Sequence, residues 1–208
     1  MLEWIMTRIF RNRELDNDLK SLENARKFVA SNPNLDTGTW SALKTIHFHL
    51  FKGIYDHAGK PRRVNFSKGG FHFLDFNDFQ AVLPKVTGMP ETSFEEIVDK
   101  YTEMNIVHPF REGNGRAMRI WLDDMLVNRL SLRVDWRLID KNDYLECMVQ
   151  SSYDNSSLKY LLSNSMTDKI NDKTIIFEGL NKSYIYEMNL DNIKKYKKGK
   201  YYEQIQLG

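Results

Sequence analysis

The sequence predicts one mainly α-helical domain that carries a single β-hairpin. Apolar residues recur at three- and four-residue steps through most of the chain, which is the period of an amphipathic helix. Only one segment alternates apolar and polar residues with a period of two. A chain of 208 residues is long enough to bury a core of its own. We therefore place the domain at residues 1–190, with its core at about 20–165, and a basic tail at 191–208.

The first expected helix runs from Arg13 to Ala30, where leucines and a phenylalanine form one apolar face. The turn sequence SNPN at 31–34 separates it from a second helix that ends near Phe51. Later helices are expected near 140–151, near 155–164, and as two pieces of 167–189 with a break near Gly179.

The hairpin is expected at 63–73, in the sequence RVNFSKGGFHF. Two short runs of alternating residues flank Lys68, Gly69 and Gly70, and glycines favour a tight turn between strands. No other segment has a strong strand pattern.

A further helix precedes the most unusual part of the chain. Ser93 and Glu96 form the S-x-x-E pattern that caps a helix start. The apolar stripe that follows continues to Asn105, and Pro109 ends the helix because proline disfavours helical dihedrals at the preceding residue.

Composition limits the compartment and the partners. The single cysteine, Cys147, excludes an internal disulfide and suits a reducing compartment. No apolar run approaches the roughly 20 residues that span a bilayer, so we expect a soluble, cytoplasmic protein without a membrane partner. Five lysines lie in KKYKKGK at 194–200, although the whole chain has a net charge of only +2. Such a tail could bind nucleic acid or acidic proteins, or it could be a solvated tail.

The segment HPFREGNGRAMR, residues 108–119, concentrates reactive side chains between two expected helices. Gly113, Asn114 and Gly115 stand where the second helix begins, and unpaired N–H groups there favour an anion. Arg116 and Arg119 are three residues apart, so both can reach phosphate oxygens from one helix face.

Two more side chains complete this cluster. Glu112 could bind a Mg²⁺ ion that a nucleotide carries, and His108 could take a proton from a hydroxyl near neutral pH. Taken alone, a histidine before a proline, a GNG turn or two arginines are common structural features. Their convergence at one helix N-terminus favours a site for nucleotide transfer to a hydroxyl.

The cluster resembles the motif of the Fic family, HxFx(D/E)GNGRxxR, at every specified position. The match includes Phe110, which in the family anchors the loop in the core, and the hairpin resembles the Fic flap. The resemblance covers about residues 20–190. It implies a Fic-type helical domain that transfers AMP from ATP to a hydroxyl of a target protein, with Mg²⁺ as the cofactor.

The resemblance also implies a role for each residue. His108 would be the base, Glu112 the Mg²⁺ ligand, and Arg119 the residue that grips the γ-phosphate. Since a related kinase subfamily has lysine in place of Gly115, the glycine here favours AMP transfer. The flap would align the target by main-chain hydrogen bonds. The implied nucleotide-binding residues are Lys68, Gly69, Asn105, Gly113, Asn114, Gly115, Arg116 and Arg119.

A second resemblance concerns regulation. Fic proteins often carry an inhibitory helix with the motif (S/T)xxxE(G/N), and SYIYEM at 183–188 matches it with Ser183 and Glu187. Its C-terminal position, at about 183–190, resembles the single-domain class of the family. Met188 departs from the motif. The alternative is a plain amphipathic terminal helix. If the helix is inhibitory, its release makes Tyr184 and Tyr186 candidate sites of self-modification.

The partners and rival functions are expectations of the same kind. The resemblance suggests a toxin-like bacterial enzyme, with subunits of bacterial type II topoisomerases as candidate targets and a homo-oligomer as an open alternative. A Fic fold could also transfer UMP, phosphate or phosphocholine, or remove AMP. The basic tail could make the chain a nucleic-acid-binding protein, although we do not expect nucleic acid to be the main ligand.

Overall fold

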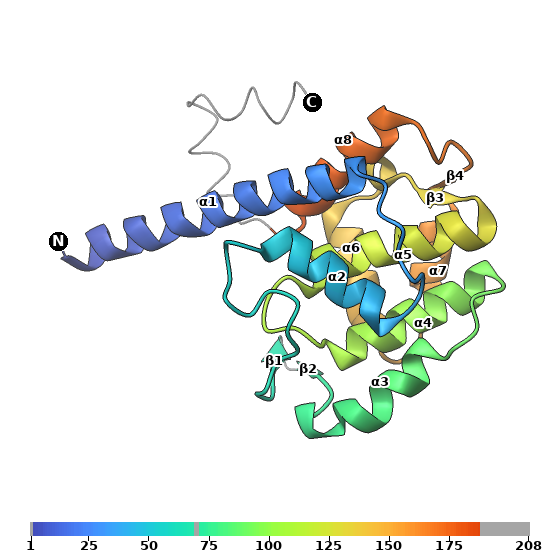
Figure 1. Ribbon diagram of the computed structural model, residues 1–208, viewed down its shortest axis with the longest axis horizontal. Coiled ribbons are helices and arrows are strands. Elements are labelled where there is room, and N and C mark those ends of the chain that lie inside the picture. Colours follow the sequence, from blue (N-terminus) through green and yellow to red (C-terminus); the bar gives the residue numbers. More distant parts are fainter. Residues whose placement is uncertain (1, 69–70, 188–208) are drawn as a thin grey trace.

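The helix that follows the motif, α5 (Asn114–Leu130), forms the centre of the structure (Figure 1). The computed structural model describes the backbone of residues 2–68 and 71–187, and the side chains of 13–67 and 71–187. Helix α5 packs between α4 (Phe94–Val107) and α2 (Trp40–Phe51). Its buried apolar side chains are Ala117, Met118, Trp121, Leu122, Met125 and Leu126.

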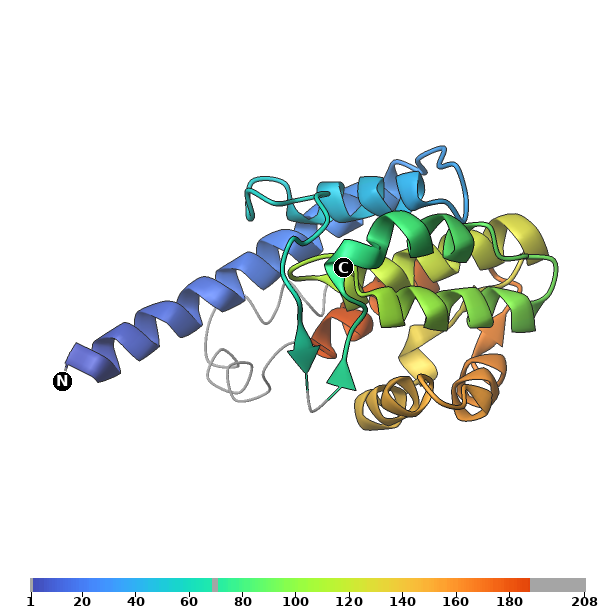
Figure 2. The same ribbon diagram turned by 90° about the horizontal axis from the view of Figure 1, so that it is seen from below.

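The other helices surround this centre. Helix α1 (Leu2–Ala30) packs against α2 and α8 (Lys173–Ile185), and its N-terminal half extends beyond the body of the molecule (Figures 1 and 2). The remaining helical elements are η1 (Phe76–Asp78), α3 (Phe79–Thr87), η2 (Trp136–Leu138), α6 (Lys141–Gln150) and α7 (Ser156–Ser163). The mainly α-helical class predicted from the sequence is confirmed.

Two short antiparallel ladders occur in the described part of the chain. The predicted hairpin is present as β1 (Ser67–Lys68) and β2 (Phe71–His72), and it projects from the body in Figure 2. A second ladder pairs β3 (Arg133–Val134) with β4 (Met166–Thr167). The sequence did not predict this second ladder, because two residues per strand are too few to show a period.

The helix boundaries follow local signals closely. Ser93 and Glu96 form the predicted capping box at the start of α4. The predicted break near Gly179 is wrong, since α8 is continuous from Lys173 to Ile185. A Cβ at Gly179 would lie 3.5 Å from Trp136, an ordinary van der Waals distance, so this glycine sits in a regular turn of α8 and does not interrupt the helix. Ser183 therefore lies in the last turn of α8 itself.

Two expectations concern parts of the chain away from the site. Cys147 is partly buried on α6. None of the helices that the structure describes is long and apolar enough to cross a membrane. The basic tail at 191–208 lies outside the described residues.

Candidate active site

Two residues with a left-handed backbone conformation shape the motif loop between α4 and α5. His108 ends α4 with a φ of 48°, and Gly113 caps α5 with a φ of 81°. A Cβ at Gly113 would lie 2.2 Å from the Phe51 ring, so this position needs glycine for both its conformation and its packing. The loop therefore turns back sharply and presents the first N–H groups of α5.

Buried side chains hold this loop in place. Phe110 is fully buried, as the resemblance implied. The side chain of Asn114 accepts a hydrogen bond from the Phe110 N–H at 2.8 Å and donates one to the Phe110 carbonyl at 2.7 Å. These two bonds tie the start of α5 to Phe110, so the Asn114 side chain holds the loop in shape.

His47 of α2 also supports the loop, a role that no local sequence pattern indicated. It is fully buried, and its ring stacks on Phe110 with the ring centres 3.7 Å apart. Its Nε2–H donates to the Glu112 carbonyl at 2.8 Å, and its Nδ1 accepts from the Gly59 N–H at 2.9 Å. These two bonds require the neutral imidazole, because a protonated ring has no acceptor.

We expect His47 to make the fold sensitive to acid. Burial lowers its pKa to about 4, against the opposing effect of the bond to the Glu112 carbonyl. The unfolded chain binds a proton near pH 6.5, so this stabilisation is complete above that pH and is lost as the pH falls toward 4. Between pH 7 and pH 5 the free energy of unfolding should fall by about 2 kcal/mol through this residue.

Urea denaturation at both pH values tests this expectation. His47→Gln should lose this part of the pH dependence, while His72→Gln, at an exposed position of the hairpin, should keep it. An equal pH dependence in parent and His47→Gln would contradict the assignment.

Arg62 joins the motif loop to both arms of the hairpin, and sequence reasoning missed it as well. Its buried guanidinium donates to the carbonyls of His108 at 2.8 Å and Val107 at 3.1 Å. It also donates to Val64 at 2.6 Å and to Leu74 at 2.5 Å, one residue on each side of the hairpin. The His108 backbone and the hairpin are thus fixed by one cation.

The hairpin also covers His108 directly. The ring of Phe73 stacks on the His108 ring, with centres 3.8 Å apart. Asn105 lies partly exposed near the end of α4. Lys68 contributes its backbone to β1, while its side chain and Gly69 lie outside the described parts of the chain.

The first motif arginine, Arg116, is buried against two carboxylates. Its Nη1 donates to Asp18 of α1 at 2.6 Å, and its Nη2 donates to Glu112 at 3.0 Å. Burial raises the pKa of Asp18, although the Arg116 guanidinium opposes this. Asp18 is a site residue that the sequence did not reveal, because 98 positions separate it from Arg116.

The second motif arginine, Arg119, contacts the end of α8. Its Nη1 donates to Glu187 at 3.1 Å, and its Nη2 donates to the Ser183 carbonyl at 2.9 Å. Burial would lower the pKa of Arg119, but the Glu187 carboxylate and the neighbouring tyrosines outweigh it and the pKa is raised. A buried guanidinium is thus kept charged by a carboxylate of the C-terminal segment.

Glu187 also approaches the start of α5. A Cβ at Gly115 would lie only 2.3 Å from Glu187 Oε1, so the carboxylate lies over the backbone that the sequence predicts to bind phosphate. Glu187 therefore occupies an anion position between a helix N-terminus and an arginine.

Both tyrosines of the terminal segment are buried. The Tyr184 hydroxyl donates to the Ser21 carbonyl at 3.1 Å. The Tyr186 hydroxyl donates to the Ile139 carbonyl at 2.9 Å. Neither can accept a group in this conformation, so self-modification would require the end of α8 to move.

Glu112 is the motif carboxylate that could bind a metal ion. Its side chain is 54% exposed at the start of α5, and Asp18 binds the same arginine. No group of three or more metal-binding side chains is present among the described residues. Mg²⁺ usually combines one or two carboxylates with phosphate oxygens and water. These residues fit an ion that arrives with a nucleotide.

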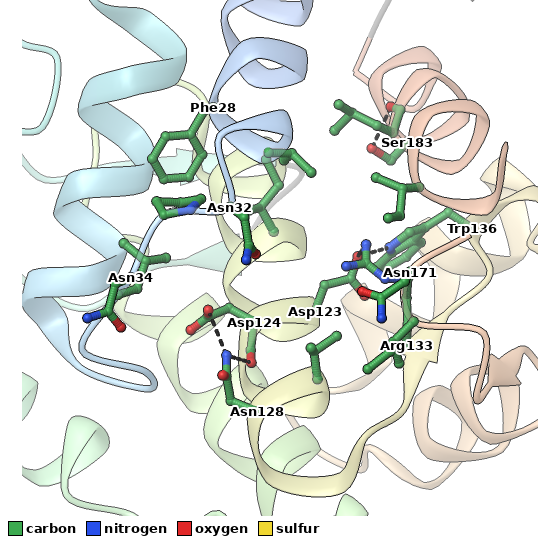
Figure 3. Close-up of a pocket in the computed structure, with 18 residues that line it drawn as sticks. Phe28, Asn32, Asn34, Asp123, Asp124, Asn128, Arg133, Trp136, Asn171 and Ser183 are labelled. Atoms are coloured by element: carbon green, nitrogen blue, oxygen red, sulfur yellow. Dashed lines mark hydrogen bonds and ion pairs between the residues drawn. The ribbon is translucent and has the colours of Figure 1, made fainter. Parts of the chain in front are cut away.

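A separate recess of about 310 Å³ is lined by residues of α1, α5 and α8, among others (Figure 3). Its polar lining includes Asp123, Asp124 and Asn128 of α5, while Ser183 forms part of its wall. None of the motif residues 108–119 lines it. The recess is therefore not the anion site.

Comparison with known proteins agrees with this geometry. Residues 39–126 match the model of the Fic/DOC family. The chain is 27% identical over 188 residues to protein adenylyltransferase VbhT of Bartonella schoenbuchensis, which covers 83% of this chain and 38% of the relative. It is 30% identical over 110 residues to "Probable protein adenylyltransferase Fic" of Escherichia coli, which covers 48% and 54%. The chain thus spans about half the length of these relatives or less.

Solved structures show the same fold. The BepC protein of Bartonella tribocorum, with bound AMPPNP, aligns with a TM-score of 0.64 at 19% identity, over 75% of this chain and 87% of that one. An N-terminal Fic domain of a Bartonella quintana effector, with bound ADP, aligns with a TM-score of 0.66 at 19% identity, over 80% and 88%. The motif loop, the hairpin and the comparisons lead to one conclusion: the chain has the fold of Fic domains, and residues 39–126 of it match the Fic/DOC family model.

Proposed function

We propose that the chain is a protein adenylyltransferase that moves AMP from ATP to a hydroxyl of a target protein, and that the end of α8 inhibits it. The observation that carries this proposal is the position of Glu187. Its carboxylate lies over Gly115 and pairs with Arg119, where the phosphates of a nucleotide would find N–H donors and a cation. An internal anion marks the phosphate site and blocks it.

The relatives support this activity. VbhT and the Escherichia coli protein are named as adenylyltransferases, and the two Bartonella domains were solved with AMPPNP and ADP. By analogy we assign the same reaction to this chain. Its target is a protein, and subunits of bacterial type II topoisomerases are the first ones to test. We place the reaction in the cytoplasm, where ATP is available.

The described residues suggest the following mechanism. The backbone at 113–116 and Arg116 hold the α- and β-phosphates, and Arg119 holds the γ-phosphate. The target hydroxyl oxygen attacks the α-phosphorus while His108 takes its proton. The bond from the α-phosphorus to the bridging oxygen breaks, and pyrophosphate leaves. Glu112 would hold Mg²⁺, which neutralises charge on the phosphates when bound.

The inhibition follows from charge. While Glu187 pairs with Arg119, that arginine is not available to the γ-phosphate, and the carboxylate repels it. ATP that binds under this restriction would turn its α-phosphate away from the acceptor. The proposed inhibitory contact therefore changes the orientation of bound ATP and need not keep ATP out of the site.

The reaction class can be tested with ATP labelled at either end. The Glu187→Gly variant is incubated with a bacterial lysate and Mg²⁺, using ATP labelled at the α-phosphate or at the γ-phosphate. Adenylylation transfers only the α-label to protein, whereas phosphorylation transfers only the γ-label. The mass added to the modified peptide separates AMP from UMP and phosphocholine. Protein labelled from the γ-position alone would contradict the proposal.

Glu112→Gln tests the proposed metal ligand. The amide is nearly the same size, so folding should survive, but it binds a hard cation more weakly than a carboxylate. In the Glu187→Gly background we expect loss of most of the rate and of the Mg²⁺ dependence, measured by titrating Mg²⁺ against labelling. Asp168→Gln, at an exposed position away from the motif, is the control. A metal titration that matches the background variant would show that Glu112 is not the ligand.

A further inference from the structure

The contacts of Arg119 come from two different parts of the fold. Helix α8 and the residues just after it supply the Ser183 carbonyl, the Glu187 carboxylate and the Tyr186 ring, whose centre lies 5.4 Å from the guanidinium carbon. Helix α6 supplies Tyr144, whose ring centre lies 5.6 Å away. The guanidinium thus lies beside two tyrosine rings that stack on each other, of which one belongs to the segment proposed to withdraw.

Tyr144 is fixed independently of that segment. It is buried, and its ring meets the Trp136 ring edge-on, with centres 5.6 Å apart. Its hydroxyl lies 2.5 Å from the hydroxyl of Tyr101, which α4 places in the core. Tyr144 also stacks on Tyr186 at 5.3 Å. Withdrawal of α8 would remove this last contact and leave the other two.

We propose that Tyr144 is the positioning residue that holds the Arg119 guanidinium in place for the γ-phosphate after the end of α8 has withdrawn. This inference rests on the proposed function, because it assumes that Arg119 receives the γ-phosphate. Tyr101 acts one step further away and orients the Tyr144 hydroxyl.

The chemistry of the two side chains explains this role. A guanidinium only donates hydrogen bonds, and the hydroxyl of the neighbouring Tyr144 is an acceptor that Arg119 would reach once Ser183 and Glu187 have withdrawn. The face of the ring attracts the cation as well. Arginine has many rotamers, so a released Arg119 without a fixed partner would lose freedom only when ATP binds, and ATP would bind more weakly. Tyr144 keeps the guanidinium ordered beforehand.

The test compares ATP with ADP, because only ATP has the phosphate that Arg119 would hold. Dissociation constants for both nucleotides with Mg²⁺ are measured by titration calorimetry in the Glu187→Gly background. We expect Tyr144→Phe to weaken ATP binding about tenfold, the usual effect of one lost hydrogen bond to a charged group, while ADP binding changes little. Tyr101→Phe should have a smaller effect in the same direction. Tyr160→Phe, at an exposed tyrosine of α7, should change neither constant.

Two further variants complete the design. Arg119→Ala gives the largest loss of ATP preference that the site can show. Tyr101→Phe/Tyr144→Phe removes both hydroxyls and leaves no buried one unpaired, so the comparison can be made even where the single variant unfolds. If Tyr144→Phe and the double variant keep the full preference for ATP, the Tyr144 assignment is overturned. If Glu187→Gly itself binds ATP no better than ADP, the proposed role of Arg119 fails, and the role of Tyr144 fails with it.

Discussion

Glu187→Gly should convert a weakly active chain into one that labels itself and other proteins with AMP. Removing the carboxylate frees Arg119 for the γ-phosphate and clears the space above Gly115. The α-phosphate can then face the acceptor hydroxyl. We expect the gain as an increase in label incorporated from α-labelled ATP at equal protein concentration and excess Mg²⁺. Peptide mass spectrometry should find AMP on Tyr184 or Tyr186, which become accessible when the end of α8 moves.

Glu178→Gly is a matched control for this experiment. It places a glycine within α8 itself, whereas Glu187 lies just beyond the end of α8, and it removes a glutamate whose ion pair is with Arg137, away from the motif. If glycine activated the protein only by loosening the helix, both variants would gain activity. Equal or lower labelling by Glu187→Gly than by the parent would show that the end of α8 only packs against the domain.

His108→Ala should abolish transfer and leave ATP binding largely intact. In the proposed mechanism His108 acts on the acceptor hydroxyl, whereas the start of α5 and the two arginines hold the nucleotide. Loss of a general base typically lowers the rate by about 10²- to 10⁴-fold. We expect a loss of this size in the Glu187→Gly background, measured as initial labelling rate, with a nearly unchanged dissociation constant for ATP.

The backbone at His108 requires a second variant. Its φ of 48° is strained for alanine, so part of the loss could come from a distorted loop. Asparagine adopts this conformation more readily, and His108→Asn should lose as much rate as His108→Ala while unfolding at a higher temperature. His49→Ala, on α2 away from the motif, should keep its rate. Near-normal turnover by both His108 variants would rule out the histidine as the base.

The sequence predicted those parts of the site that depend on local signals. The capping pair Ser93 and Glu96 fixes where α4 begins, and the glycines of the motif fix the turn before α5. The spacing of Arg116 and Arg119 predicted one helix face for both, and both are buried at the N-terminal end of α5. Each of these inferences needed only residues within one or two helical turns.

The parts that the sequence did not predict depend on contacts between distant segments. Asp18, Arg62 and His47 all act on the motif across long stretches of chain. An aspartate in an amphipathic helix or an arginine in a loop is normally a solvated residue, and only tertiary packing buries it.

The proposed inhibitory residues, Ser183 and Glu187, lie in the last turn of α8 and just after it. This position would also set the basal activity of the enzyme. The earlier turns of α8 lie in the core, so opening the site requires only that the last turn frays. Helix ends fray at a far smaller cost than global unfolding, and an opening cost of about 2 kcal/mol would leave roughly 3% of molecules open at any moment. The hydrogen bonds from Tyr184 to the Ser21 carbonyl and from Tyr186 to the Ile139 carbonyl would set this cost. Loss of either hydrogen bond would raise the fraction of open molecules by up to about tenfold. The basal activity of such an enzyme would therefore vary in steps with the number of these bonds.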